Sequence, residues 1–163
     1  MRFHVAQQHG LSNARSPFRV VEQSGREVEW VNRYLDQQRV RGVAGSTLRS
    51  YAHDLLHFLR WWATAHKTSS ISKDALTEST FLDYIRFQVN QSPPPAAESI
   101  NRRVGTAERA MRREFPEAAP SVCARLSELV LAAIAAWLRA ATPGADSVAG
   151  KDAQTLDRAI VGR

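Results

Sequence analysis

Two histidines lie one helical turn apart in the segment SYAHDLLHFLRWW, residues 50–62, with the spacing of a zinc-binding helix. Histidines at positions i and i+4 project from one side of a helix and can ligate the same metal, while a nearby carboxylate polarises a bound water. His53 and His57 have this spacing, and Asp54 stands where the zinc-hydrolase motif has a glutamate. A catalytic zinc needs a third protein ligand, and neither the remaining histidines nor Cys123 form a recognisable ligand pair. We therefore expect no metal and no cofactor, and we place both histidines on the polar side of an amphipathic helix.

This histidine-bearing helix is predicted to run from Thr47 to about Ala65, with Ser46 as its N-cap. Apolar residues recur along it at helical spacing, which predicts a buried face made of Leu48, Tyr51, Leu55, Phe58, Leu59 and Trp62. A second stripe, expected to face solvent, contains Arg49, His53, His57 and Arg60. Taken alone, this stripe is consistent with phosphate contacts or with an ordinary solvated surface.

Three further helices are predicted around it. One begins near Arg26 and stops near Gly42, the next is capped by Thr77 or Ser79 and ends at SPPPAA, and the last runs from near Glu98 to Pro116. The inner face of the last helix contains Ile100, Val104, Ala107, Met111 and Phe115, and its outer face contains Arg102, Arg103, Thr106, Arg109 and Arg113. Together the helices predict one core that includes Leu48, Tyr51, Leu55, Phe58, Ile85, Val104 and Met111.

The two ends of the chain give weaker patterns. Residues 1–25 mix polar residues with glycine and proline without a clear periodicity, and we predict a flexible N-terminal arm. Residues 117–163 are an alanine-rich tail in which Val122–Leu138 predicts an additional helix of undefined packing. No strand pattern is evident before this tail, so the predicted fold class is all-α.

The composition favours a soluble, cytoplasmic protein with an anionic partner. The formal net charge is +6 and the pI is about 10.2, and arginine supplies most of the basic residues. Arginine forms paired hydrogen bonds to phosphates and to guanine edges better than lysine does. The single cysteine rules out an internal disulfide, and the most apolar stretch is too short to cross a bilayer.

Residues 26–116 resemble the N-terminal core-binding domain of tyrosine recombinases, the phage-integrase family. The resemblance is carried by STLRSYAHDLLHFLRWW, by ALTESTFLDYI and by INRRVGTAERAMRREF, in that order along the chain. It implies a four-helix, SAM-like orthogonal bundle that binds double-stranded DNA through its second and fourth helices. Carried onto this sequence, the DNA-binding residues are Ser46, Thr47, Arg49, His53, Arg102, Arg103, Thr106 and Arg109.

The chain departs from that family beyond the fourth helix. The family cleaves DNA with a tyrosine and a set of arginine, lysine and histidine or tryptophan residues in the following domain, whereas no tyrosine or histidine follows Pro116 here. We therefore expect no strand cleavage and predict the DNA-binding module of a truncated or frame-disrupted integrase, with double-stranded DNA and other recombinase protomers as partners. The alternative is a helical protein-interaction module that docks through the apolar tail.

Overall fold

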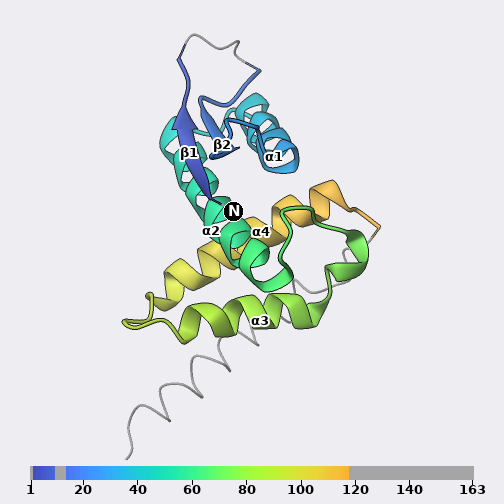
Figure 1. Ribbon diagram of the computed structural model, residues 1–163. Coiled ribbons are helices and arrows are strands. Elements are labelled where there is room, and N and C mark those ends of the chain that lie inside the picture. Colours follow the sequence, from blue (N-terminus) through green and yellow to red (C-terminus); the bar gives the residue numbers. More distant parts are fainter. Residues whose placement is uncertain (1, 10–13, 118–163) are drawn as a thin grey trace, which may run out of the picture.

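A computed structural model describes residues 2–9 and 14–117 as four α-helices and a two-stranded antiparallel sheet (Figure 1). The elements in chain order are β1 (Phe3–Gln7), β2 (Phe18–Glu22), α1 (Glu29–Val40), α2 (Gly45–His66), a short 3-10 helix (Lys73–Ala75), α3 (Glu78–Val89) and α4 (Ala97–Glu114). In Figure 1 the two strands and α1 lie toward one end and α3 toward the other, with α2 passing between them. The fold is mostly helical but mixed, so the all-α prediction is wrong.

The helix boundaries follow from local chemistry. After α1 the chain turns at Gly42, whose φ of +79° is in the left-handed region, and the amides of Gly42 and Val43 bond back to the carbonyls of Arg39 and Gln38. Thr77 caps α3 by accepting a hydrogen bond from the amide of Thr80, as predicted. These bonds satisfy backbone groups that a helix end would otherwise leave unpaired.

The strands correct the prediction of a flexible N-terminal arm. β1 pairs with β2 in antiparallel register from Phe3 opposite Glu22 to Gln7 opposite Phe18. Phe3, Phe18 and Val20 are buried in the same core as the helices. An isolated hairpin is only marginally stable in water, so burial of these apolar side chains against the helices is what stabilises the two strands.

Polar contacts also join this sheet to the helices. The buried amide side chain of Asn32 in α1 accepts from the Val20 amide at 2.8 Å and donates to the Val20 carbonyl at 3.0 Å. Arg19, itself buried, forms ion pairs with Glu27 and with Asp36. These bonds fix β2 against α1 at two successive residues.

The predicted core is largely confirmed. Buried side chains include Leu48, Leu55, Phe58, Ile85, Val104 and Met111, while Tyr51 is only partly buried. An aromatic cluster lies where α2 meets α3, with the Phe58 ring 5.1 Å from that of Tyr84 and 6.1 Å from that of Phe81, measured between centroids. This cluster and the α2–α4 contact hold α2, α3 and α4 together.

The predicted helix at Val122–Leu138 and the rest of the tail after residue 117 lie outside the described residues. Within residues 2–9 and 14–117, no helix combines the length and hydropathy required to cross a bilayer.

Candidate nucleic-acid interface

The outer side of α4 presents a line of arginines. Arg102, Arg109 and Arg113 are separated by seven and four residues, so they lie on one side of the helix, and all three are exposed. The opposite side, with Ile100, Val104, Ala107 and Met111, is buried against the core. The amphipathic division of this helix was therefore predicted correctly except at Thr106, and it orients these three arginines outward.

Asp54 of α2 fixes the first of these arginines. Arg102 donates from Nε to Oδ2 of Asp54 at 3.0 Å and from Nη2 to Oδ1 at 3.1 Å. Asp54 is 2 % exposed, whereas the Arg102 side chain is 54 % exposed. Hydrogen bonds to the carboxylate raise the pKa of Arg102. The guanidinium is thus held from its inner edge, while its Nη1 group makes no hydrogen bond to Asp54 and is available for a ligand.

Thr106 does not belong to the predicted outer face. Its side chain is 0 % exposed, and its hydroxyl donates to Oδ2 of Asp54 at 3.4 Å. Thr106 also accepts a hydrogen bond from Nη2 of Arg109 at 3.2 Å. Its predicted role as a DNA contact is therefore replaced by a bridging role between Asp54 and Arg109.

Arg109 lies where α2 and α4 approach each other. Its guanidinium carbon is 5.7 Å from the ring centroid of Tyr51, a cation–π contact. Tyr34 of α1 stands beside the same pair, with its ring 6.3 Å from that of Tyr51. Burial raises the pKa of the Tyr34 hydroxyl above its ordinary value.

Arg103 reaches toward α2 and α3. Its Nη1 donates to Oε1 of Gln88 at 3.3 Å and lies 3.5 Å from Nε2 of His57. The other ring nitrogen of His57 is 2.8 Å from the hydroxyl of Tyr84. Since arginine can only donate, the contact favours the tautomer of His57 with its proton on Nδ1. His57 is thus half-buried and bonded internally, although the sequence placed it in a solvent-facing stripe.

These contacts also bear on the zinc-helix pattern. His53 is exposed to solvent, whereas His57 forms a hydrogen bond with Tyr84, so the two imidazoles lie in different environments. Within the described part of the chain, no three histidine, cysteine or carboxylate side chains are grouped so that they could hold a metal ion.

The environment of His57 predicts a pH dependence of stability. Burial, followed by the nearby charge of Arg103, lowers the pKa of His57 from 6.5 to about 4. Between these two pH values the unfolded chain takes up a proton that the folded chain does not, so the free energy of unfolding should fall as pH is lowered through this interval. Urea unfolding over the same range should show a flatter dependence for His57→Gln. His53→Gln, which leaves the Tyr84 bond in place, is the matched control. Equal pH dependence in wild type and His57→Gln would contradict this assignment.

The remaining predicted contacts are at the beginning of α2. The helix starts at Gly45 with Ala44 as N-cap, so Ser46 lies inside the first turn and is not the cap. Ser46, Arg49 and His53 are exposed, and Thr47 is partly buried. Arg49 precedes Asp54 by five residues, which places it about 140° around the helix from the side that contacts α4. The structure therefore places Arg102, Arg103 and Arg109 along the α2–α4 contact, with Arg49 on a separate side of α2.

Asp54 and Gln88 are the contributors to this site whose roles were missed by sequence reasoning. Asp54 lies three positions after Tyr51 and four before Phe58, within the apolar side of α2. A carboxylate in such a position requires a cationic partner, so this spacing was a usable signal. Gln88 falls within the apolar pattern of α3, and its partner could not be deduced from spacing alone.

Comparison of the chain with protein-family models, with curated proteins and with solved structures gives no match.

Proposed function

We propose that this chain binds double-stranded DNA through Arg102, Arg103 and Arg109 of α4, and that it serves as the DNA-binding part of a site-specific recombinase. The observation that carries the proposal is that all three guanidinium groups contact α2, Arg102 at Asp54, Arg103 at His57 and Arg109 at Tyr51. We call these three arginines the α2–α4 edge. Arginine suits this role because its planar donor groups match phosphate oxygens in pairs.

The charge of this edge favours a polyanion. Among the described residues, Arg102 is balanced by Asp54, whereas Arg103 and Arg109 have no carboxylate within 4.0 Å. Their polar contacts within this part of the chain are neutral, namely Gln88 and His57 for Arg103 and Thr106 for Arg109. Two uncompensated positive charges at a fixed separation can each neutralise one phosphate and release counterions.

The resemblance of residues 26–116 to recombinase core-binding domains supports the same function, because that family also uses its second and fourth helices. The tyrosines among the described residues do not suggest a nucleophile. Tyr34 and Tyr84 are buried, and burial raises the pKa of both hydroxyls, whereas Tyr51 is occupied by Arg109. We therefore propose binding without strand cleavage, with other recombinase protomers as further partners on the DNA.

The proposal is tested by the salt dependence of duplex binding. Replacing both Arg103 and Arg109 by glutamine should weaken binding and reduce the slope of log K against log[salt] by up to about 1.8, if each arginine meets one phosphate. Fluorescence anisotropy of a labelled duplex, measured over a series of salt concentrations, gives both quantities.

Arg26→Gln combined with Arg86→Gln is the matched control, since it removes the same formal charge from two exposed positions outside this edge. An equal loss of slope in both double variants would show that charge acts diffusely and that the α2–α4 edge is not the interface. Wild-type protein that shows no salt-dependent duplex binding would exclude a DNA role.

A further inference from the structure

A second basic feature lies beyond the proposed DNA-binding edge, between the C-terminal parts of α1 and α4. It is a groove of about 340 Å³. Its lining includes Gln37, Gln38 and Arg41 from α1, and Arg109, Arg112 and Arg113 from α4. Arg41 is the C-cap residue of α1, so its side chain extends from the end of that helix. Four arginines therefore line this groove, and of these only Arg109 also belongs to the proposed DNA-binding edge.

Of the carboxylates near this groove, one pairs with a lining arginine and the other with an arginine outside the lining. Glu108 pairs with Arg112 at 2.9 Å, and Glu114 pairs with Arg33 at 3.3 Å. Within residues 2–9 and 14–117, no carboxylate lies within 4.0 Å of the guanidinium groups of Arg41 or Arg113. The groove consequently keeps positive charge that the described residues do not neutralise.

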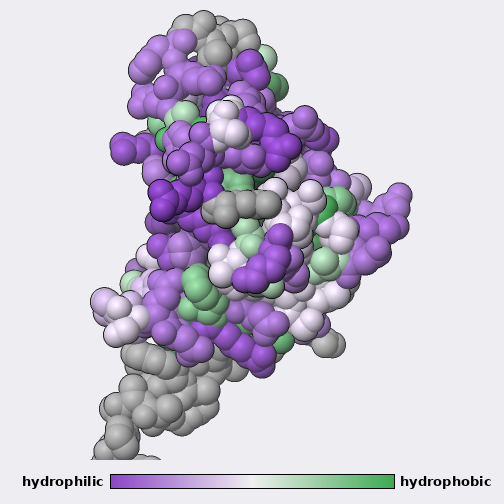
Figure 2. All heavy atoms as spheres, viewed as in Figure 1, coloured by the Kyte–Doolittle hydropathy of each residue, from purple (hydrophilic) through white to green (hydrophobic). Residues whose placement is uncertain are grey.

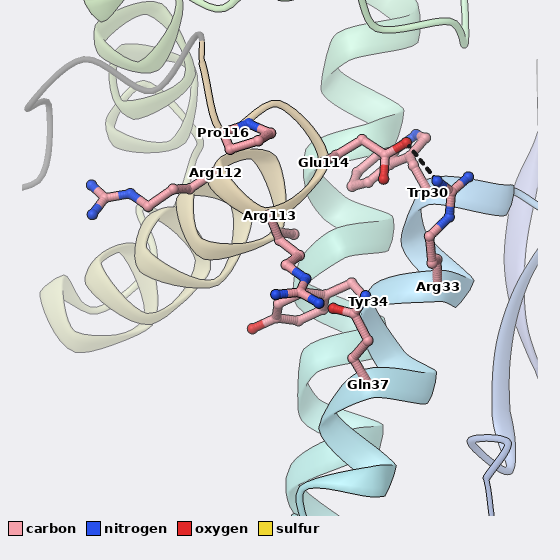
Figure 3. Close-up of a pocket in the computed structure, with 9 residues that line it drawn as sticks. Trp30, Arg33, Tyr34, Gln37, Arg112, Arg113, Glu114 and Pro116 are labelled. Carbon is pink, nitrogen blue, oxygen red and sulfur yellow. Dashed lines mark ion pairs between the residues drawn. The ribbon is translucent and has the colours of Figure 1, made fainter.

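The lining combines the neutral amide donors of Gln37 and Gln38 with the charged donors of the arginines. Figure 3 shows the side chain of Arg113 directed toward Tyr34 and Gln37 of α1, whereas that of Arg112 extends in a different direction. Amides of glutamine and guanidinium groups both donate to oxyanions, and arginine does so with paired, charge-assisted bonds. Because the lining offers mainly hydrogen-bond donors, a small tetrahedral oxyanion fits this groove better than an apolar ligand does.

We infer that the α1–α4 groove is a second anion site, and that it binds a phosphate group. The location favours the backbone of a DNA duplex as the source. Arg109 lines the groove and also contacts Tyr51 at the proposed DNA-binding edge. Along α4, the separation of eleven positions between Arg102 and Arg113 corresponds to about 16 Å, roughly the rise of five nucleotides along the axis of a duplex. A free phosphorylated small molecule has the same chemistry and is the other source.

The experiment uses the full chain and follows backbone amide signals by NMR during two titrations, one with inorganic pyrophosphate and one with a short duplex. Pyrophosphate should cause saturable shifts at Gln37, Gln38 and Arg41. Arg41→Gln combined with Arg113→Gln should weaken pyrophosphate binding at least about tenfold, because two charge-assisted hydrogen-bonding groups are lost. Arg26→Gln combined with Arg86→Gln should bind pyrophosphate like wild type.

The two titrations separate the sources and separate this inference from the proposed function. Groove shifts with both probes would identify the duplex backbone, and groove shifts with pyrophosphate alone would identify a free phosphorylated molecule. The site is excluded if neither probe shifts the groove, or if both double variants bind pyrophosphate equally. Arg109 belongs to both sites, so only the Arg41 and Arg113 variant is specific to the groove, and its pyrophosphate result does not depend on the outcome of the Arg103 and Arg109 test above.

Discussion

Replacing Phe58 by alanine should lower the free energy of unfolding by about 3–5 kcal/mol. Its side chain is 0 % exposed, and its ring centroid lies within 6.1 Å of those of Trp61, Trp62, Phe81 and Tyr84. Removal of the ring eliminates buried apolar contacts and leaves a cavity that rigid neighbouring rings cannot easily fill. Because a domain of this size has a total stability on the order of 5–15 kcal/mol, the loss would be a large fraction of it.

Urea unfolding monitored by tryptophan fluorescence and by circular dichroism measures this effect. Phe87→Ala is the matched control, since Phe87 is a phenylalanine on α3 that is 43 % exposed, and it should cost much less. A cost for Phe58→Ala no greater than that for Phe87→Ala would show that α2 and α3 do not pack through the aromatic cluster.

The helical part of this fold could be predicted from the sequence because its signals are local. Apolar residues in α2 and α4 recur at helical spacing, and Gly42 and Thr77 mark a helix end and a helix start through backbone geometry and capping. Each of these features depends on residues within a few positions of one another. The predicted buried sides of α2 and α4 were consequently correct apart from Tyr51 and Phe115, which are only partly buried, and apart from Thr106, which is buried although it was predicted to face outward.

The strands were missed because their signals are short and partly contradictory. Phe18, Val20 and Val21 favour a strand, and Gly25 with a φ of +86° marks the turn after it. Arg19 interrupts this apolar run, and it is buried only because Glu27 and Asp36 neutralise it. Such a pairing depends on the packing of α1 against β2, which no local pattern contains.

In the candidate interface, too, local sequence predicted some features, whereas others depend on packing between distant parts of the chain. Helical spacing correctly grouped Arg102 and Arg109 on the outer side of α4, but it also placed Thr106 there, because Thr106 lies only about 40° from Arg102 on the helical wheel. Thr106 is buried because α2 covers this part of α4 and supplies Asp54 as its partner. On the surface seen in Figure 2, hydrophilic side chains predominate and hydrophobic ones form small separate groups. A charged residue on such a surface therefore indicates a binding site only when it is known which charges are already neutralised by internal ion pairs, as Arg102 is by Asp54.

Arg102 is a surface arginine whose charge is partly used by an internal ion pair, so its removal should reduce the stability of the fold as well as the affinity for any ligand. Arg102→Ala should destabilise the protein by about 1–3 kcal/mol, since the buried carboxylate of Asp54 loses its charged partner and keeps only the 3.4 Å bond from Thr106. The outer half of the Arg102 guanidinium already meets solvent, so the cost originates at Asp54 and not at the arginine.

A double-mutant cycle by urea unfolding tests this origin. Asp54→Ala combined with Arg102→Ala should cost less than the sum of the two single changes, with a coupling of about 0.5–3 kcal/mol. Arg86→Ala is the control, because it breaks an arginine–aspartate pair in which both partners are well exposed, and it should change stability by less than about 0.5 kcal/mol. If Arg102→Ala costs no more stability than Arg86→Ala, Asp54 does not depend on Arg102.

The expected loss of stability in Arg102→Ala also affects binding measurements. Duplex binding by this variant must be measured at a temperature where the variant remains folded, because a loss of affinity could otherwise reflect unfolding. Variants at Arg103 and Arg109, which have no such buried carboxylate among the described residues, are therefore better suited to testing the proposed DNA contact.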